Sequence, residues 1–302
     1  MILVTGTEGM VGSHLSDVFR DDELFRTDMI GSPTATQLDV RDRDQVMRMI
    51  ERVRPSMVLH LGAETDVDRC EREPDHAYRS NMVGTLNVAL ACKAFDIELV
   101  YVSTTGVFDG ANPEPYTEFD DASPLTVYAK SKYEGEKAVA SLLSRYYICR
   151  AGWMFGGRAR DKKFVGRIVQ LCQTQPEIMA VSDKVGNPTY ASDLLGTIKY
   201  ISKTGIYGLY HVVGTGSCTR YDVAVEVAKF LDSPIRIKPV NSALFPASAP
   251  RSRSEAARNY KLDLLGMNQM RDWRVALHDY LSSWVLRPAK QQETEEALQA
   301  RA

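Results

Sequence analysis

The sequence has few cysteines, and none is arranged as a structural or metal-binding site would require. The five cysteines are Cys70, Cys92, Cys149, Cys172 and Cys218. Their number is odd, no two have the Cys-x-x-Cys spacing, and no neighbouring His or Cys completes a zinc site. We therefore predict no disulfide framework, no bound metal, and a reducing, cytoplasmic setting.

Long apolar runs and a strong charge of one sign are also missing. No run approaches the ~20 residues that cross a bilayer, and the apolar start at residues 2–5 is too short for a signal peptide. The net charge of -2 gives no electrostatic reason to expect nucleic acid or an anionic membrane as a partner. An acidic substrate must therefore meet a local group of basic side chains.

The remaining composition is that of an ordinary globular protein. Of the 302 residues, 44% are hydrophobic and 25% are charged, which is enough for one large α/β domain or one domain and a half. Strand-like and helical segments alternate along the chain, without internal repeats. Beyond Arg150 the expected strands are 178–181, 210–213 and 235–240, and the expected helices are 162–172, 192–203, 220–231 and 271–284.

A glycine-rich turn follows the first expected strand, residues 2–5. Gly6, Gly9 and Gly12 are spaced by three residues between this strand and a helix-like segment. Gly6 is expected to make a tight turn, and Gly9 to let backbone amides approach a pyrophosphate. Gly12 is expected to let the helix pack closely on the strand. The N-terminus of this helix then faces the phosphates. A merely flexible loop is the alternative. The predicted cofactor turn comprises Gly6, Thr7, Glu8, Gly9, Met10, Val11 and Gly12.

An acid ends the second expected strand, residues 24–27. At this place in a dinucleotide-binding fold an acid accepts a hydrogen bond from the ribose 2′-hydroxyl and repels a 2′-phosphate, so Asp28 favours NAD. Two alternatives stay open. Arg20 and Arg26 are near enough in sequence to serve a phosphate, and an aspartate in a strand-end turn needs no function.

Two further strand ends are candidates for the cofactor site. Residues 37–40 resemble a third short strand, in which Asp39 either meets the adenine amino group or is a strand-end or helix-capping acid. The buried strand 56–61 is followed by small residues that leave room for a ligand. Asp39, Val40, Leu61, Gly62 and Ala63 are assigned to the cofactor site.

Tyr128 and Lys132 have the spacing of side chains that share one face of a helix, one turn apart. A free phenol has a pKa near ~10. An ammonium beside it favours the phenolate and lowers that pKa toward working pH, which lets Tyr128 exchange a proton with a carbonyl oxygen. The alternative is an amphipathic helix that carries this pair without function.

Hydroxyl groups upstream support the chemical interpretation. The fifth expected strand, 98–102, is followed by Ser103, Thr104 and Thr105, whose hydroxyls are placed to donate to the same carbonyl oxygen. Asn81 belongs to a long helix expected from about 75 to 94. It is either a plain polar residue or a bridge, through water, between a backbone carbonyl and Lys132.

Together these motifs resemble an extended short-chain dehydrogenase/reductase, and within that superfamily the chain is most similar to dTDP-4-dehydrorhamnose reductases. The similarity covers roughly residues 1 to 285. It is carried by the glycine turn, Ser103-Thr104 with 107–110, Tyr128-x-x-x-Lys132 with Gly135-Glu136, and segments 61–68, 77–81, 150–156 and 186–194.

The resemblance implies an α/β fold with a doubly wound parallel sheet (Rossmann) and a smaller C-terminal α/β substrate-binding region. It also implies reduction of the 4-keto group of a nucleotide-linked deoxysugar by NAD(P)H. Asp28 slightly favours NADH as that cofactor. Thr104, Tyr128 and Lys132 correspond to the catalytic residues, with Asn81 in support. Tyr128 and Lys132 also belong to the cofactor site, where Lys132 holds the nicotinamide ribose. Substrate binding is assigned to Glu64, Thr65, Thr104, Thr105, Trp153 and Arg251.

Two departures from the family pattern concern the sugar. Thr105-Gly106 stands where these reductases usually have Asp-Tyr, and 250–253 reads Pro-Arg-Ser-Arg where they usually carry Arg-Pro. A nucleotide-sugar epimerase or dehydratase of the same superfamily stays open, as does a non-catalytic NAD(P)-binding regulatory subunit. A lost Tyr or Lys would mark the subunit, and both residues are present.

The expected organisation is a dinucleotide-binding domain at 1–155 with 188–215 packing back on it. A substrate-binding region at 156–187 and 216–287 follows, with a Pro/Ala/Ser specificity loop at 240–250 and a flexible tail at 288–302. As partners we expect a nucleotide-sugar substrate, no nucleic acid and no membrane. A homodimer stays open as an alternative to a monomer.

Overall fold

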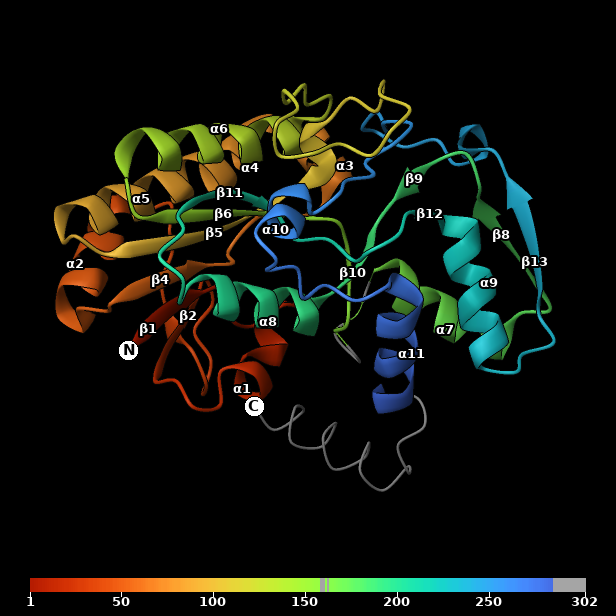
Figure 1. Cartoon of the computed structure of the whole chain (residues 1–302), viewed down its shortest axis with the longest axis horizontal. Coiled ribbons are helices and arrows are strands. Elements are labelled where there is room, and N and C mark those ends of the chain that lie inside the picture. The colour runs from red at the N-terminus through yellow and green to blue at the C-terminus, as the bar shows by residue number, and fades with distance from the viewer. Residues whose placement is uncertain (158–160, 162, 285–302) are drawn as a thin grey trace.

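The computed structural model describes residues 1–157, 161 and 163–284, so the expected tail at 288–302 lies outside the described residues. A seven-stranded parallel sheet forms the larger of two units (Figure 1). Its strands are β1 (Ile2–Thr5), β2 (Leu24–Asp28), β3 (Thr36–Gln37), β4 (Met57–His60), β5 (Glu98–Thr104), β6 (Tyr146–Ala151) and β11 (Gly208–His211).

The strand order is β11-β6-β5-β4-β1-β2-β3, so the chain leaves β1 toward β2 on one side and returns to β4 on the other. In open α/β sheets such a reversal leaves a crevice at the carboxyl ends of the strands. The predicted doubly wound class is confirmed. The segment 188–215 contributes β11 to this unit, because β11 pairs with β6 at the sheet edge.

Helices cover both faces of the sheet, as Figure 1 shows. One face packs against α2 (Arg43–Val53), α5 (Gly84–Ala94) and α6 (Val127–Leu142), whose buried apolar residues include Ile50, Val88 and Val139. The other face packs against α1 (Leu15–Val18), α8 (Ala191–Ile201) and α10 (Tyr260–Leu264). Among the described residues, no helix combines the length and apolar character needed to cross a membrane.

The smaller unit has its own apolar core. Strands β8 (Glu177–Val181) and β13 (Arg236–Val240) pair in parallel, and α7 (Phe164–Thr174), α9 (Arg220–Phe230) and α11 (Trp273–Trp284) pack around them. Two short pairs connect this unit to the sheet. They are β7 (Trp153–Phe155) with β10 (Pro188–Tyr190), and β9 (Val185–Gly186) with β12 (Cys218–Thr219).

Three expected elements differ from the structure. The third strand is Thr36–Gln37 and not 37–40, because after the Leu38 N–H···O=C bond to Asp28 the chain turns away from the sheet edge to start α2. The glycine turn leads into a short 3₁₀ turn (Gly12–His14) and a single turn of α-helix, α1.

The expected helix at 75–94 is the third difference. It consists of α4 (Pro74–Tyr78), a π-helical turn (Arg79–Val83) and α5, preceded by α3 (Val67–Arg72). The π turn admits one extra residue per hydrogen-bonded ring and is frequently found at functional sites. Here it carries the fully buried Asn81.

Candidate active site

A cavity of about 900 Å³ lies where the sheet and the smaller unit meet. Thr5, Asp28, Leu61 and Thr104, at or just after the carboxyl ends of β1, β2, β4 and β5, line one part of it. Residues of the smaller unit line the rest. The cavity therefore occupies the crevice that the reversed strand order creates.

The glycine turn forms a backbone cradle at one end of this cavity. Gly6 has a φ of 71°, and a Cβ there would lie 2.7 Å from the Gly62 backbone, so the loops after β1 and β4 touch. A Cβ at Gly12 would lie 2.1 Å from the Thr7 carbonyl oxygen. At Gly9, which lines the cavity, a Cβ would contact Gly6 O at 3.3 Å. A side chain at residue 9 would therefore occupy the open side of the cradle.

Most residues predicted to bind the cofactor line the cavity. They are Gly6, Glu8, Gly9, Met10, Val11, Asp28, Asp39, Val40, Leu61, Gly62, Ala63 and Tyr128. Three others lie behind its wall. Thr7 is buried and donates its hydroxyl to Thr27 O at 3.2 Å, Gly12 packs against Thr7, and Lys132 is 3% exposed.

Two acids near the β2 end line the cavity beside the cradle. Asp28 Oδ2 accepts the Glu8 N–H at 3.0 Å, and the Glu8 carboxylate accepts hydrogen bonds from the hydroxyls of Ser32 and Thr34. Backbone and hydroxyl donors thus hold both carboxylates on the cavity wall. They are acceptors of the kind that a ribose hydroxyl requires.

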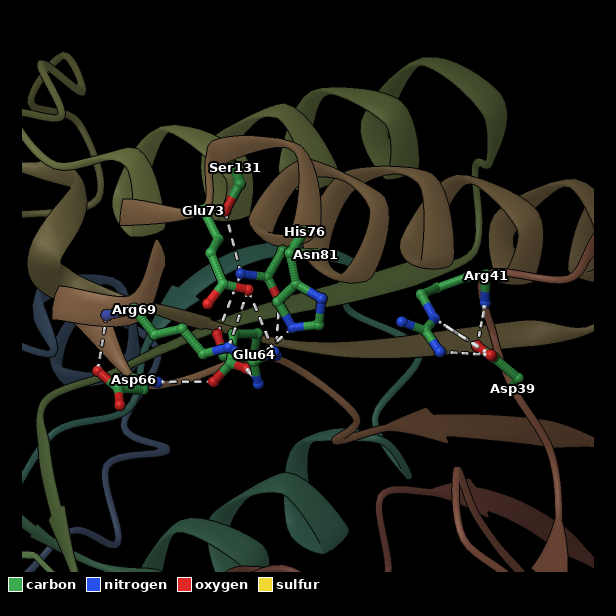
Figure 2. A network of polar contacts seen from close by, with 9 residues as sticks. All are labelled: Asp39, Arg41, Glu64, Asp66, Arg69, Glu73, His76, Asn81 and Ser131. Carbon is green, nitrogen blue, oxygen red and sulfur yellow. Dashed lines mark hydrogen bonds and ion pairs between the residues drawn. The ribbon is translucent and has the colours of Figure 1, made fainter. Parts of the chain in front are cut away.

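Asp39 lines the cavity too, but its carboxylate is occupied (Figure 2). Arg41 donates Nε to Oδ1 at 2.8 Å and Nη2 to Oδ2 at 2.7 Å, and this pair lowers the pKa of Asp39 and raises that of Arg41. Asp39 is therefore not free for the adenine amino group. Neither Arg20 nor Arg26 lines the cavity; the arginine on this part of the wall is Arg41.

Tyr128 faces the cavity from the first turn of α6, which begins where the Thr126 side chain accepts the Ala129 N–H. Burial raises the pKa of the Tyr128 phenol well above its ordinary value, a hydrogen bond from Thr104 partly opposes this, and the Glu255 charge adds to it. The phenol therefore keeps its proton at neutral pH. Thr104 also accepts the Gly106 N–H at 3.0 Å, which fixes its rotamer beside Tyr128.

Lys132 lies one turn along α6, below the cavity wall. Its Nζ donates to Val102 O at 2.8 Å and lies 4.2 Å from the centroid of the Tyr101 ring. Burial lowers the pKa of Lys132 to about 7, although the charge of Glu136 opposes that change. The expected lowering of the Tyr128 pKa is not found: burial raises that pKa, and the group that lowers it is Thr104, by a hydrogen bond, and not Lys132.

The side-chain amide of Asn81 joins two parts of the site (Figure 2). Its Nδ2 donates to Glu64 O at 3.1 Å and to Ser131 Oγ at 3.0 Å, and its Oδ1 accepts the Glu64 N–H at 2.9 Å. Asn81 thus fixes the loop after β4 against α6, beside Lys132. This direct link stands where the sequence interpretation placed a water bridge to Lys132.

Glu64 has its own partners on the cavity wall. Its carboxylate accepts hydrogen bonds from the Asp66 N–H, from His76 Nε2 at 3.0 Å and from Arg69 Nη1 at 3.1 Å (Figure 2). Burial opposes ionisation of Glu64, but these donors together lower its pKa. Glu64 is therefore a charged acceptor held in one orientation.

Of the predicted substrate residues, Glu64, Thr65, Thr104, Trp153 and Arg251 line the cavity, and Thr105 does not. Trp153 lines the cavity and donates its indole N–H to Glu255 at 3.2 Å, while Thr65 accepts from Lys163 Nζ at 3.3 Å. Thr105 is 1% exposed and does not line the cavity. Arg251 lines it.

The Arg251 guanidinium, however, is engaged by the protein. It donates to Asp68 Oδ2 at 2.8 Å and to Ala249 O at 3.1 Å. Asp68 Oδ1 also accepts the Ala249 N–H, so α3 anchors the end of the 240–250 loop. Three residues of that loop, Ser242, Phe245 and Ala247, line the cavity.

Seven ionisable cavity residues were not predicted from the sequence: Arg41, Arg69, His76, Lys163, Lys184, Arg220 and Glu255. No motif spacing connects them with each other or with Tyr128. The one available signal was local, since Thr219 and Asp222 form a capping box that places Arg220 at the first position of α9. Their proximity to the site follows from the tertiary fold.

Comparison with known proteins identifies relatives over most of the chain. The family model described as RmlD substrate binding domain matches residues 1–285. A dTDP-4-dehydrorhamnose reductase of Mycolicibacterium smegmatis is 33% identical over 288 residues, covering 94% of this chain and 86% of that protein.

Solved structures agree. A dTDP-4-dehydrorhamnose reductase from Clostridium acetobutylicum superposes with a TM-score of 0.88 at 33% identity, covering 93% of this chain and 98% of the other. The enzyme of that name from Bacillus anthracis, solved in complex with NADP, gives the same TM-score, identity and coverage.

Proposed function

This chain belongs to the RmlD substrate binding domain family, and we propose that it reduces the 4-keto group of a nucleotide-linked deoxysugar with NAD(P)H. The curated relatives and solved neighbours that carry reductase names support this activity at 33% identity over most of the chain. The observation that carries the assignment is the placement of Tyr128 and Thr104 on the wall of the same cavity as the glycine cradle.

The residues of the cavity fit a dinucleotide. The backbone at Gly9 lines the cavity, and a Cβ there would contact Gly6 O at 3.3 Å, so the glycine leaves space of the kind that a pyrophosphate requires. Asp28 and Glu8 offer carboxylates for the ribose hydroxyls beside it. A volume of about 900 Å³ is at the upper end for single-ligand sites, as expected for a cavity that admits a cofactor together with a sugar nucleotide.

Tyr128 is the proton donor in this proposal. When bound, the nicotinamide supplies the hydride to the carbonyl carbon. Tyr128 holds its proton because burial raises its pKa, and it releases that proton to the carbonyl oxygen as negative charge develops there. The Thr104 hydroxyl, paired with the phenol, orients the same oxygen.

Lys132 and Asn81 act from behind the wall. The Lys132 ammonium, held by Val102 O one turn below Tyr128, places positive charge near the phenolate that proton transfer leaves. Asn81 keeps α6 in register with the loop after β4 through Ser131 and Glu64. We assign both as positioning residues, since neither lines the cavity.

Tyr128→Phe tests this assignment, because it removes the transferable proton and keeps the ring. Turnover of the best nucleotide 4-ketosugar should fall by on the order of 10²–10⁴, while the Kd for NADH stays within about twofold of the parent. Tyr133→Phe is the matched control, since Tyr133 lies on the same helix but does not line the cavity. Turnover within about threefold of the parent in Tyr128→Phe would contradict the catalytic assignment and favour the regulatory-subunit alternative.

Cofactor stoichiometry separates the reductase from the related epimerase and dehydratase. A reductase consumes one NAD(P)H for each ketosugar, whereas the other two return the cofactor to its starting state. We further propose that NADH is at least competitive with NADPH, because Asp28 and Glu8 meet the ribose and Asp39 neutralises Arg41. The reducing, cytoplasmic setting stays our proposal, supported by five free cysteines.

A further inference from the structure

Arg220 stands out among the basic residues of the cavity because its guanidinium lies against two aromatic rings. Its Cζ lies 3.8 Å from the centroid of the Trp153 ring and 5.0 Å from that of Phe164. No hydrogen bond or ion pair joins this guanidinium to any residue in the described part of the chain. The two rings hold it in place and leave its N–H donors for a ligand.

A partly buried guanidinium in such a setting requires an acceptor. Removing it from water without hydrogen bonds is unfavourable, and burial lowers the pKa of Arg220 to about 10, although the charge of Glu255 opposes that change. Glu255 itself is half-buried and accepts the Trp153 indole N–H, and burial raises its pKa. It therefore compensates Arg220 incompletely.

Lys163 adds a second positive charge close to Arg220. It lines the same cavity next to Phe164, and its Nζ donates to Thr65 Oγ1 at 3.3 Å. Burial lowers the pKa of Lys163, the charges of Asp66, Asp161 and Glu64 oppose that change, and the charge of Arg220 adds to it. Two cations that repel each other across a cavity are stabilised when an anion with several oxygens lies between them.

Arg251, the arginine assigned to substrate binding from the sequence, is less available to a ligand. Arg251 donates to Asp68 at 2.8 Å, and the Lys184 ammonium donates to the Arg251 carbonyl oxygen at 2.9 Å. A ligand would have to break the Asp68 pair in order to use Arg251. Arg220 and Lys163 need no such exchange.

We propose that Arg220 and Lys163, rather than Arg251, bind the diphosphate of the nucleotide sugar. This inference rests on the proposed function, since it names the residues that hold the substrate of that reaction. The cofactor pyrophosphate is the other diphosphate available, and the Gly9 cradle accounts for it at the β1 end of the cavity. Arg220 instead stacks on Trp153, which belongs to β7 and connects the sheet to the smaller unit.

Calorimetric titration of the full chain with thymidine diphosphate, uridine diphosphate, thymidine and NADH, each alone, tests the proposal. In Arg220→Met the Kd for the better nucleoside diphosphate should rise about tenfold or more, because hydrogen bonds to charged groups are lost. The Kd values for thymidine and NADH should change by less than about twofold. Lys163→Met should show the same pattern, and Arg220→Lys, which keeps the charge without the planar fork, should be intermediate.

Arg274→Met is the matched control. Arg274 also stacks on a tryptophan in the first turn of a helix, with Cζ 4.4 Å from the Trp273 ring, but it does not line the cavity. Its nucleoside diphosphate affinity should equal that of the parent, and thermal unfolding should show that all variants fold.

Parental nucleoside diphosphate affinity in both Arg220→Met and Lys163→Met would overturn the inference, as would a loss confined to NADH. Parental enzyme that binds nucleoside diphosphate yet oxidises neither NADH nor NADPH with any 4-ketosugar would instead overturn the proposed function. These two failures are therefore distinguishable.

Discussion

Asp39→Asn should increase the affinity of the protein for NADPH. In the structure the Asp39 carboxylate holds Arg41 by hydrogen bonds of 2.7 and 2.8 Å, and both residues line the cavity near Asp28. Arg26, an alternative phosphate ligand from the sequence, instead donates to Ser16 at 2.7 Å. Arg41 is thus the arginine available to a 2′-phosphate, and Asp39 neutralises it.

The magnitude follows from the exposure of this pair. A hydrogen bond from an arginine to a phosphate contributes ~1.5–3 kcal/mol when well formed. The side chains of Arg41 and Asp39 are 34% and 27% exposed, so solvent screening keeps the gain near the lower limit. We therefore expect the Kd for NADPH to fall by about tenfold. The Kd for NADH, whose ribose we propose to meet Asp28 and Glu8, should change by less than about twofold.

Fluorescence titration of both cofactors at two ionic strengths provides the assay. The gain should shrink at higher salt, because a partly exposed ion pair is screened. It should disappear in the double variant Asp39→Asn/Arg41→Gln, which removes the released guanidinium. A gain that persists in the double variant would refute the reasoning. If Asp39 instead bonds the adenine amino group, Asp39→Asn should weaken both cofactors about equally.

Two further predictions concern the buried charges under the site. Lys132 has a pKa of about 7 in the fold, below the ~10.4 of an unfolded lysine, so the unfolded chain binds more protons between these values and the free energy of unfolding rises with pH there. Urea denaturation should show the parent gaining stability relative to Lys132→Met from pH about 7 to about 10, and parallel profiles would contradict the assignment. Glu136→Gln should lower the free energy of unfolding by about 3–5 kcal/mol, because Arg150, 2.7 Å away and 4% exposed, loses its counter-ion. A loss under about 1 kcal/mol would show that the fold does not depend on this ion pair.

Much of the cofactor end of the site could be predicted from the sequence because its determinants are local. The glycine turn needs a strand, three glycines at fixed spacing and a helix start, all within 15 residues of one another. Tyr128 and Lys132 share a helix face because of their separation by one turn. Such relations hold in any fold that forms these elements.

The hydrogen bonds, burial and pKa values of the same side chains could not be predicted, because they depend on residues distant in sequence. Lys132 is tied to Val102 O and lies on the Tyr101 ring, contacts that β5 makes possible. Burial raises the pKa of the Tyr128 phenol, where the isolated Tyr-Lys pair predicts a fall. The π turn at Asn81 leaves no signature in helix propensity, since Arg79–Val83 reads as ordinary helix.

One end of the cavity is formed by backbone and the other by side chains, and this difference determines how each end responds to substitution. The cofactor cradle is backbone that glycine permits, so a change at Gly6 meets the neighbouring loop at 2.7 Å and alters the turn itself. The proposed substrate end is a set of side chains, Trp153, Lys163 and Arg220, which lie on three segments of the smaller unit and its connections. Replacing one of these leaves the backbone of the cradle in place. We therefore expect variation in the sugar nucleotide to arise at these positions without loss of the dinucleotide.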